Sequence, residues 1–352
     1  MERVIVSMSG GVDSTAAAIL LKEAGYDVIG VHMQLFDCLD PDRKFFRACC
    51  SIEDLDDARV SARRLGVPLY MIDMKREFGE LVIGNFISEY RNGRTPNPCV
   101  RCNQWMKFDL LVRKTARFGA RYLATGHYAR RDFRDGSFRL KKGVDQTKDQ
   151  SYFLFMLKQD MLERTLFPLG EMRKSEVREV VRKSGLKVFD KEESQEICFT
   201  SGGDYHSLIS GGAGEGDIVD VQGRKIGSHK GFFHFTIGQR KGLGVAGGKP
   251  LYVLDIIPER NLVVAGGEED LYAGALTASD LSWVSGKSPG FPIKAAVKIR
   301  YRDIGEEAVI DFAGEDRISV KFEKPVRAVT PGQAAVIYQG DEVIGGGWIE
   351  KK

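Results

Sequence analysis

The opening stretch constrains the fold of this chain more than any other part of the sequence. Residues 3–8 form an apolar run rich in β-branched side chains, long enough for one buried strand. A serine and two glycines at 9–11 interrupt this run, and 13–22 combines residues that begin helices with strong helix formers. Gly25 ends the helix, and a second apolar run follows at 28–33. The stretch therefore predicts a strand, a glycine loop, a helix and a further strand.

The glycine loop has the chemistry of a phosphate site. Gly10 and Gly11 let the backbone approach an anion without a Cβ in the way. The loop opens a helix, whose first N–H groups lack partners and carry partial positive charge. Ser9, Ser14 and Thr15 add hydroxyl donors. The G-x-x-x-x-G-K-[ST] and G-x-G-x-x-G patterns are both absent, so the loop is neither a Walker A loop nor a dinucleotide-binding turn.

Strand and helix patterns continue to alternate after the loop. Helical periodicity runs over 51–65 and 78–90, and the apolar runs at 67–72 and 122–125 are typical of strands. This alternation indicates an α/β fold built on a doubly wound parallel sheet. Ligands of such sheets bind at the carboxyl ends of the strands, where the glycine loop also lies.

The composition of the sequence changes after about residue 201, where glycines become frequent and turns separate short β-rich runs. We expect a parallel-sheet domain at 1–200, a small β-rich domain at 201–274 and a C-terminal β-barrel at 275–352. The expected strands of the last two domains lie at 217–221, 225–226, 232–237, 252–257, 262–265, 295–301, 308–312, 317–322 and 334–338.

Composition places the chain among ordinary globular proteins. Its 352 residues, 43% hydrophobic and 29% charged, suit two or three domains. No apolar run approaches the roughly 20 residues of a membrane helix. The N-terminus leads directly into a core strand with no signal peptide, so we expect a cytoplasmic protein with no membrane association. The net charge of +3 gives no indication for or against nucleic acid.

Six cysteines in such a chain are more typical of catalysis or metal binding than of structural disulfides. Cys99 and Cys102 form a C-x-x-C within 92–103, which its prolines and asparagines predict to be a structured loop rather than a helix. The motif suits a redox pair, half a zinc site or cluster ligation, and no second C-x-x-C completes a zinc site. A further cysteine, Cys198, follows a charged segment. The remaining three, which we expect to be ordinary surface or core thiols, are Cys38, Cys49 and Cys50.

Residues 117–142 interleave eight cations with five aromatic rings. Cations suit phosphates, and rings can stack on unpaired bases, so the stretch could hold RNA. The same pattern fits a solvated β-hairpin whose rings enter the core. Both interpretations stay open on the residues alone.

Residues 9–14, SGGVDS, resemble the PP-loop of the N-type ATP pyrophosphatases, whose fold is an adenine nucleotide alpha hydrolase-like sheet. The whole chain resembles the bacterial tRNA-specific 2-thiouridylases, the MnmA (TrmU) family. The matching stretches occur in family order and are MSGGVDS, GRTPNP, the Cys102-Asn103 step, ATGHYAR, KDQSYFL, FPLGEMRKSEVR, ICF, FTIGQRKGLG, VKIRYR and GGGWI.

The resemblance implies an enzyme, a tRNA-uridine 2-sulfurtransferase. ATP would adenylylate the C2 oxygen of the wobble uridine at position 34 and release pyrophosphate. A persulfide sulfur would then replace the activated oxygen and release AMP. Mg²⁺ is expected with the phosphates. The implied ATP-binding residues are Ser7, Met8, Ser9, Gly10, Gly11, Val12, Asp13, Ser14, Met33 and Gly126.

The resemblance also implies roles for the thiols and for contacts with the anticodon arm of tRNA. Cys198 would carry the persulfide, and Cys102 would attack the carrier or resolve it as a disulfide. The segment from Asn97 to position 99 would meet the target base. The implied tRNA-binding residues are Asn97, Pro98, Cys99, His127, Lys148, Asp149, Gln150, Arg300, Tyr301 and Gln333.

Position 99 departs from the family pattern, because the usual aspartate is replaced by Cys99. The replacement removes a candidate acid–base group beside the target base. It also creates a set of three thiols, Cys99, Cys102 and Cys198, and thiolates suit iron–sulfur ligation. Other PP-loop tRNA thiolases hold a [4Fe–4S] cluster with three cysteines. We therefore keep a cluster-dependent sulfur transfer beside the persulfide route, with a neutral replacement as the remaining alternative.

Two other classes of protein compete with this interpretation. An amide-forming PP-loop ATP ligase would need an ammonia source, which no glutaminase-like stretch supplies, and it would leave the thiols unexplained. A non-catalytic RNA-binding or sulfur-carrier protein is disfavoured by the intact SGGVDS. The sulfur donor stays open among a cysteine desulfurase, a relay protein and sulfide. We expect a monomer or a weak dimer.

Overall fold

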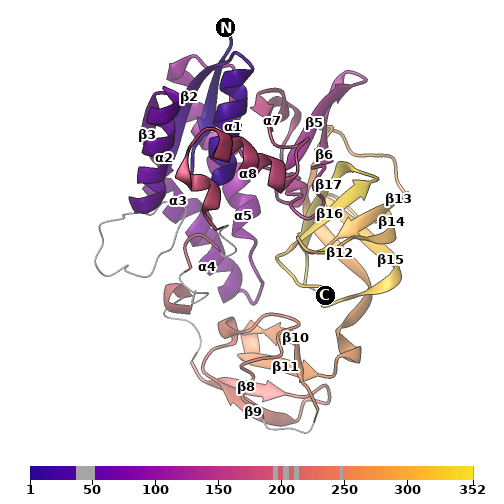
Figure 1. Cartoon of the computed structure of the whole chain (residues 1–352). Coiled ribbons are helices and arrows are strands. Elements are labelled where there is room, and N and C mark those ends of the chain that lie inside the picture. Colours follow the sequence, from indigo (N-terminus) through magenta and orange to yellow (C-terminus); the bar gives the residue numbers. More distant parts are fainter. Residues whose placement is uncertain (37–51, 193–196, 201–205, 210–213, 246–248, 352) are drawn as a thin grey trace.

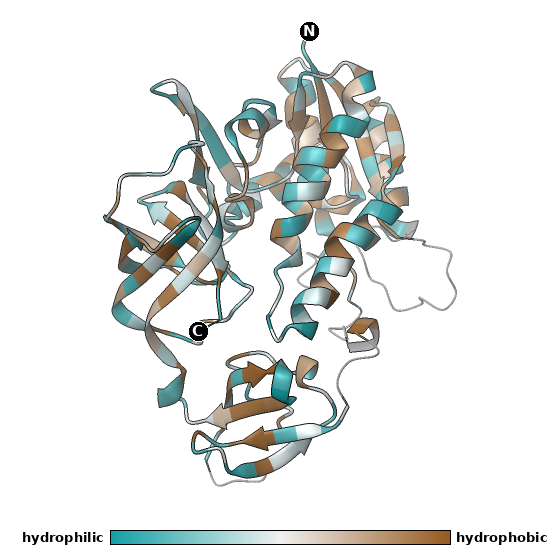
Figure 2. Ribbon diagram, turned by 180° about the vertical axis from the view of Figure 1, so that it is seen from behind, coloured by the Kyte–Doolittle hydropathy of each residue, from teal (hydrophilic) through white to brown (hydrophobic). Residues whose placement is uncertain are grey.

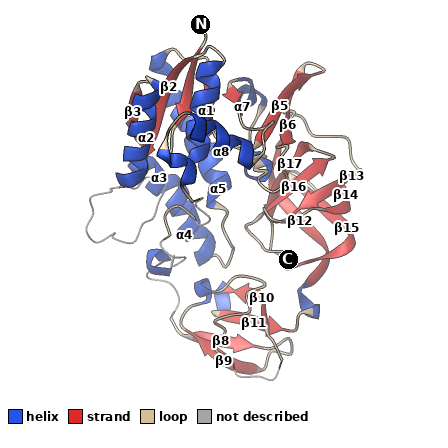
Figure 3. Ribbon diagram, viewed as in Figure 1, coloured by secondary structure: helices blue, strands red, loops and turns tan. Residues whose placement is uncertain are grey.

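The computed structural model describes residues 1–36, 52–192, 197–200, 206–209, 214–245 and 249–351. The strands in these residues form three sheets, of five, four and eight strands. In Figure 1 the five-stranded sheet lies at the upper left, the C-terminal strands at the right and the four-stranded sheet at the bottom. Figure 3 shows that helices gather around the first sheet, whereas the other two parts consist mainly of strands.

The first sheet is parallel, and its inner strands are buried on both faces. Its order is β3 (Leu69–Asp73), β2 (Asp27–Gln34), β1 (Arg3–Ser7), β4 (Tyr122–Ala124) and β7 (Thr165–Leu166). On one face lie α1 (Val12–Glu23) and α2 (Ile52–Leu65), and α8 (Lys174–Lys183) packs against α1. Val4 and Val6 of β1 point toward these helices, whereas Ile5 packs with the helices of the opposite face. The doubly wound parallel sheet is therefore confirmed.

The opposite face is covered by two long helical segments. The first consists of α3 (Lys75–Phe78), a π-helical turn (Gly79–Ile83) and α4 (Gly84–Arg91). The second consists of α5 (Pro98–Arg101), a π-helical stretch (Cys102–Leu111), α6 (Val112–Thr115) and a 3₁₀ turn (Ala116–Phe118).

The structured loop predicted over 92–103 is wrong in its second half, because α5 begins at Pro98. Proline is favoured in the first turn of a helix, where its missing N–H has no partner to lose. Asn97 caps this turn, and its side-chain oxygen accepts a hydrogen bond from the Val100 N–H at 3.4 Å. Proline and asparagine are therefore helix-start residues here, and the C-x-x-C motif lies on a helix.

The C-terminal strands form a closed antiparallel barrel. Its strands are β12 (Tyr272–Trp283), β13 (Ile293–Lys298), β14 (Glu306–Phe312), β15 (Arg317–Arg327), β16 (Ala334–Gln339) and β17 (Glu342–Ile349). They follow the order β12-β15-β14-β13-β16-β17, and pairing of β12 with β17 closes the ring. Buried and exposed residues alternate along most of β15, and hydrophobic and hydrophilic colours alternate along the barrel strands in Figure 2. The predicted C-terminal barrel is confirmed.

The small sheet has the order β10 (Tyr252–Ile257), β11 (Leu262–Gly266), β8 (Gly216–Val219) and β9 (Lys225–His229). The strand predicted at 232–237 is wrong, because Phe232–His234 forms a 3₁₀ turn. Phe232, Phe233 and Phe235 are all buried, so consecutive rings enter the core instead of alternating between two faces. The run was apolar enough for a strand, and its lack of alternation was the overlooked signal.

A hairpin from the first 200 residues joins the barrel. It consists of β5 (Ala129–Arg134) and β6 (Ser137–Lys142), and β6 pairs with β17. This pairing crosses the proposed boundary at 200. The remaining elements are α7 (Gln159–Glu163) and 3₁₀ turns at Ser151–Leu154, Lys187–Asp190, His206–Ile209, Pro258–Arg260 and Glu269–Leu271. Across the described ranges, no helix is both long enough and apolar enough to cross a bilayer.

Candidate active site

The glycine loop follows β1, the central strand of the parallel sheet, and leads into α1. The Ser14 hydroxyl ties the loop together, because it accepts a hydrogen bond from the Ser9 N–H at 3.1 Å and donates to the Gly11 carbonyl at 3.1 Å. The Met8 N–H donates to Val31 on β2 at 2.8 Å. The loop is thus held at the carboxyl end of the sheet, where parallel sheets bind ligands.

Two glycines allow the loop to pack closely against its neighbours. Gly10 has a φ of +80°, and a Cβ there would lie 2.0 Å from the Asp54 carbonyl oxygen on α2. A Cβ at Gly126 would lie 2.7 Å from the Asp13 carbonyl carbon and 2.9 Å from the Ser14 nitrogen. The structure therefore brings Gly126 directly against the loop, and its contact with ATP stays a prediction. Met33, at the carboxyl end of β2, is partly buried and packs against the adjoining core.

Asp13 is held by two residues that sequence reasoning did not single out. The Lys174 ammonium lies 2.7 Å and 2.8 Å from the two carboxylate oxygens of Asp13, and the Lys174 side chain is only 11% exposed. The Tyr128 hydroxyl donates to the same carboxylate at 2.8 Å. Both residues lie in family-matching stretches, ATGHYAR and FPLGEMRKSEVR, but nothing in the sequence connects them with Asp13.

Two histidines near the loop are buried. The Nδ1–H of His32 donates to the Met8 carbonyl at 2.8 Å, and burial lowers the pKa of His32. His127 lies 2.8 Å through Nδ1 from the Thr125 hydroxyl, among the rings of Phe108 and Phe167. Burial, and secondarily the charge of Lys107, lowers the pKa of His127 well below its ordinary range, so its imidazole is neutral near pH 7.

The C-x-x-C motif occupies the start of the second helical segment. Cys99 is exposed and Cys102 is buried. Arg101, between them, packs its guanidinium over Trp348 of β17 at 3.9 Å and over Trp105 at 4.8 Å. It also reaches Asp280 of β12 at 3.2 Å. Arg101 thereby holds the motif against the barrel.

Cys198 lies in a short turn, where the Thr200 N–H donates to the Ile197 carbonyl at 3.0 Å. It is partly buried and packs against the hydrophobic cluster that contains Cys102. The next residue, Phe199, contacts Phe78 and Phe86, with ring centroids 5.8 Å and 5.0 Å apart. Cys102 thus belongs to this extended hydrophobic cluster, and Cys198 packs against it.

Some of the residues predicted to meet tRNA lie where the parallel-sheet part joins the barrel. Gln333 donates from its amide to the Thr95 and Pro96 carbonyls at 3.0 Å and 2.9 Å, beside the buried Asn97 and Pro98. Arg300 donates to the Ala328 carbonyl. The ring of Tyr301 lies 4.5 Å from that of Phe153.

Residues 148–151, the K-D-Q-S stretch, also form hydrogen bonds with other parts of the chain. Asp149 is buried and accepts from the Gly143 and Ser151 N–H groups, each at 3.1 Å. The side-chain oxygen of Gln150 accepts from the Tyr128 N–H at 3.0 Å. Lys148 is partly buried in the same turn. These bonds give Asp149 and Gln150 a structural role, whatever their contacts with RNA.

The second part of the basic and aromatic stretch, 129–142, forms the β5–β6 hairpin, whereas its first part lies in a 3₁₀ turn, in β4 and in the loop after β4. The hairpin interpretation is therefore correct for 129–142 only. Phe133 nevertheless stays 63% exposed near the hairpin turn and lies 4.9 Å from Phe138. The Arg131 guanidinium packs over Phe138 at 5.0 Å. An RNA contact at this hairpin stays a prediction. Cys38, Cys49 and Cys50 lie outside the described residues.

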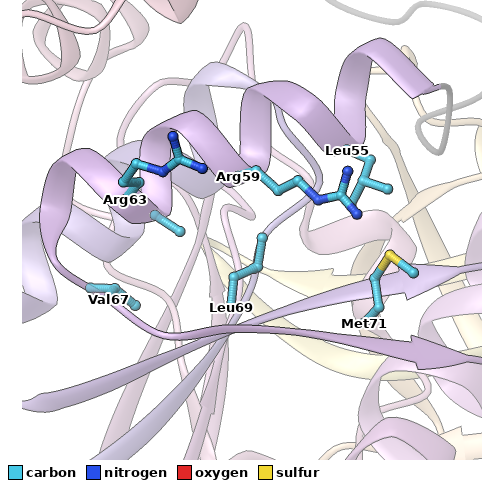
Figure 4. Close-up of a pocket in the computed structure, with 7 residues that line it drawn as sticks. Leu55, Arg59, Arg63, Val67, Leu69 and Met71 are labelled. Carbon is cyan, nitrogen blue, oxygen red and sulfur yellow. The ribbon is translucent and has the colours of Figure 1, made fainter.

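A surface cavity of about 420 Å³ lies between α2 and β3, away from the predicted site residues (Figure 4). Apolar side chains and two arginines line it. The lining residues are Leu55, Arg59, Ala62, Arg63, Val67, Leu69 and Met71.

The central parallel strand ends in a serine- and glycine-rich loop at the start of a helix. This arrangement defines the class of protein, a PP-loop nucleotide-binding enzyme. Three family models cover the chain: a tRNA methyl transferase HUP domain over residues 2–202, a tRNA methyl transferase PRC-barrel domain over 210–267 and an aminomethyltransferase beta-barrel domain over 273–349. The names of these models mention methyl transfer, whereas the curated relatives described next are named thiouridylases.

The tRNA-specific 2-thiouridylase MnmA of Geobacter metallireducens is 48% identical over 99% of this chain and 97% of its own length. That of Carboxydothermus hydrogenoformans is 48% identical over 100% of this chain and 98% of its own length. The chain therefore belongs to the family of tRNA-specific 2-thiouridylases. Among solved structures, a 4-thiouridine synthetase in complex with RNA and ATP is 15% identical, with a TM-score of 0.36 over 56% of this chain and 44% of that chain. This similarity is too low to indicate a function for this chain.

Proposed function

We propose that this protein is an ATP-dependent tRNA-uridine 2-sulfurtransferase that converts the wobble uridine at position 34 to 2-thiouridine. The observation that carries the proposal is 48% identity, over 99% of the chain, to a protein named a tRNA-specific 2-thiouridylase. The intact phosphate loop supports it.

In the first step, the uridine C2 oxygen attacks the α-phosphorus of ATP. A bond forms between that oxygen and phosphorus, and the bond to the β-phosphate bridge breaks and releases pyrophosphate. The loop from Ser7 to Ser14 would hold the phosphates with its N–H groups and hydroxyls, and Met33 and Gly126 would line the adenosine site. Mg²⁺ typically binds substrate phosphates and one or two carboxylates, and Asp13 is the carboxylate in this loop.

In the second step, the terminal sulfur of a Cys198 persulfide attacks C2, and the bond from C2 to the adenylyl oxygen breaks to release AMP. The Cys102 thiolate then attacks the inner sulfur of Cys198. The bond between the two persulfide sulfurs breaks, which leaves sulfur on C2 and a Cys102–Cys198 disulfide. A thiol reductant resets the pair.

Cys99, Cys102 and Cys198 are the thiols that would hold a [4Fe–4S] cluster. Within the described ranges, no three His, Cys, Asp or Glu side chains are grouped so that they could hold a metal ion. We therefore derive no step through a cluster. The cluster route stays a prediction that iron analysis of anaerobically purified protein tests.

The partners follow from the same chemistry. The anticodon arm of tRNA would lie at the junction beside Asn97 and Gln333, with His127 and Lys148 as further contacts. The sulfur donor for the persulfide would be a cysteine desulfurase or a relay protein, whereas sulfide would serve the cluster route. A monomer or weak dimer stays a prediction.

The test is a thiolation assay with tRNA, Mg²⁺-ATP and a persulfide donor, which transfers its outer sulfur to the Cys198 thiolate, and it is read by mass spectrometry of nucleosides. We expect wild type and Cys99→Ala to form 2-thiouridine, and Cys198→Ser and Cys102→Ser to lose it by about 100-fold or more. Loss of both iron and activity in Cys99→Ala would replace the persulfide route by the cluster route. Turnover with ammonia and no RNA would instead support an amide-forming ligase.

A further inference from the structure

Lys298, the last residue of β13, is a buried lysine on the outer face of the barrel. The residue is only 7% exposed. Ala295 and Val297 of the same strand enter the barrel core, so the Lys298 side chain leaves the barrel wall on the opposite face. There its ammonium lies 5.7 Å from the centre of the Tyr338 ring, on β16. The chain thus places a cation in the junction between the barrel and the first part of the molecule.

A second lysine approaches the same ring from that first part. Lys142 ends β6, which pairs with the barrel strand β17 (Figure 1), and its ammonium lies 4.6 Å from the Tyr338 ring centre. Arg139 of the same strand has an ion pair with Glu342 at 2.8 Å. In the part of the chain that the structure describes, neither Lys142 nor Lys298 has such a pair with a carboxylate.

Two carboxylates act on Lys298 from a distance without pairing with it, those of Asp149 and Asp303. Asp149 is engaged in its own turn. Its Oδ1 accepts from the Gly143 and Ser151 N–H groups at 3.1 Å each, and its Oδ2 accepts from the Ser151 hydroxyl at 3.0 Å. Asp303 is partly buried, and burial raises its own pKa. Neither carboxylate therefore neutralises the lysine by direct contact.

This arrangement is costly for the protein by itself. Burial lowers the pKa of Lys298, Asp149 raises it, and the positive charge of Lys142 lowers it again. A contact with the Tyr338 ring offsets only part of the cost of burying an ammonium, and two ammonium groups beside one ring repel each other. An anion in contact with both groups would offset both costs.

The surroundings of the two lysines indicate the chemical class of this anion. Lys148, a predicted tRNA contact, directly precedes Asp149, and the predicted contacts Arg300 and Tyr301 follow Lys298 by two and three positions. RNA presents one phosphate per nucleotide, and lysine binds phosphate as a point charge. The phosphate would approach from the side of Lys142, which is only partly buried.

We propose that Lys142 and Lys298 form a phosphate site at the barrel junction, filled by a backbone phosphate of the bound tRNA. The proposal rests on the proposed function, in which the anticodon arm of tRNA lies at this junction. It deepens that function, because it names two charges that hold the RNA independently of its sequence.

The first test measures the affinity of the full-length protein for tRNA by filter retention over a range of salt concentrations. Lys298→Met removes the charge and keeps the length of the side chain. We expect its affinity to fall about fivefold at physiological salt, and the slope of log affinity against log salt to fall by about one. Lys142→Met should do the same, and Lys298→Arg should keep most of the affinity and slope.

The matched control is Lys321→Met, which removes an exposed lysine of β15, a strand separated from β13 by β14. Its affinity and salt slope should equal those of wild type. Should Lys298→Met fail to fold, Lys142→Met carries the test, because Lys142 is less buried. Wild-type salt slopes in both Lys298→Met and Lys142→Met, or no binding of tRNA by wild type, would overturn the proposal.

The second test measures the thermal stability of the free protein. Because Lys298→Met replaces a buried charge by an apolar side chain, we expect its Tm to equal or exceed that of wild type, although it binds tRNA less tightly. A lysine that serves only the fold would instead show a lower Tm with an unchanged salt slope, which would overturn the proposal.

Inorganic phosphate distinguishes the two sources of the anion. At ionic strength matched with sodium chloride, a larger rise of Tm with phosphate in wild type than in Lys298→Met would show that the site also takes free phosphate. Equal rises, together with the loss of tRNA affinity, would assign the site to the RNA backbone.

These readouts need neither ATP nor a sulfur donor, so they separate the two proposals. Binding of tRNA that depends on Lys142 and Lys298, in a protein that forms no 2-thiouridine, would defeat the proposed function and leave the phosphate site intact. Normal thiolation with wild-type salt slopes in both variants would defeat the phosphate site alone.

Discussion

At the scale of single residues, Gly10 and Gly11 are neighbours with very different constraints. Gly10 has a positive φ and no room for a Cβ, whereas a Cβ at Gly11 would meet only the Ser9 hydroxyl, at 3.6 Å. We expect Gly10→Ala to lower the free energy of unfolding by about 1–3 kcal/mol, and Gly11→Ala to change it by about 0.5 kcal/mol or less. Urea unfolding of the two variants measures this, and equal losses would contradict the packing of Gly10 on α2.

His127 makes the stability of the protein depend on pH. Because burial depresses its pKa in the folded state, the unfolded chain binds more protons than the folded one as pH falls below the ordinary value of 6.5. The stabilisation is complete above that pH and is lost below it. We expect unfolding free energy to fall between about pH 7.5 and 5.5, and this fall to be up to about 1.4 kcal/mol smaller in His127→Asn. An identical fall in both proteins would show that His127 is not buried as a neutral ring.

At the scale of elements, Arg101 fastens the helix that carries Cys99 and Cys102 to the barrel. Arg101→Ala removes the packing on Trp348 and leaves Asp280 without this partner, so we expect a loss of about 1–3 kcal/mol in unfolding free energy. Arg113→Ala is the control, because its pair with Asp109 is exposed on the same helical segment and should contribute about 0.5 kcal/mol or less. The helix is not fastened in this way if the two variants unfold alike.

Elements were predictable from the sequence where one local pattern dominated. The strand–loop–helix unit of β1 and α1 has strand formers, glycines and helix formers in unambiguous order, and the structure has them at 3–7 and 12–23. The start of α5 was missed because proline and asparagine break helices internally but also begin them. Only the hydrogen bond from Val100 to Asn97 distinguishes the two cases, and that bond exists only in the folded chain.

At the scale of the whole molecule, Gln333 joins the barrel to the segment before the C-x-x-C helix. Its amide satisfies the carbonyls of Thr95 and Pro96, and the Thr95 N–H donates to Pro331 at 2.8 Å. We expect Gln333→Ala to lower unfolding free energy by about 1–2 kcal/mol even without RNA, since it leaves part-buried carbonyls without these donors. Unchanged stability with weakened tRNA binding would instead assign Gln333 to RNA alone.

The site was only partly predictable from the sequence, because some of its residues are brought together only by the fold of the whole molecule. The phosphate loop is contiguous, so its residues could be named from sequence. Lys174 and Asp13 are 161 positions apart, and Lys191 and Asp54 are 137 apart, so their pairing depends on how α8 and the turn that follows it pack against α1 and α2. Barrel closure through β12 and β17, and the attachment of β6 to β17, are likewise long-range pairings that no local pattern encodes.

The most direct measurement follows the oxygen that sulfur replaces. tRNA carrying a heavy oxygen isotope at C2 of uridine 34 is incubated with the protein, Mg²⁺-ATP and a sulfur donor. The masses of the AMP and of the nucleosides are then measured by mass spectrometry. Adenylylation of the C2 oxygen predicts that 2-thiouridine forms and that the heavy oxygen appears in AMP, one atom for each uridine thiolated. Absence of 2-thiouridine, or its formation with unlabelled AMP, would contradict the proposed reaction.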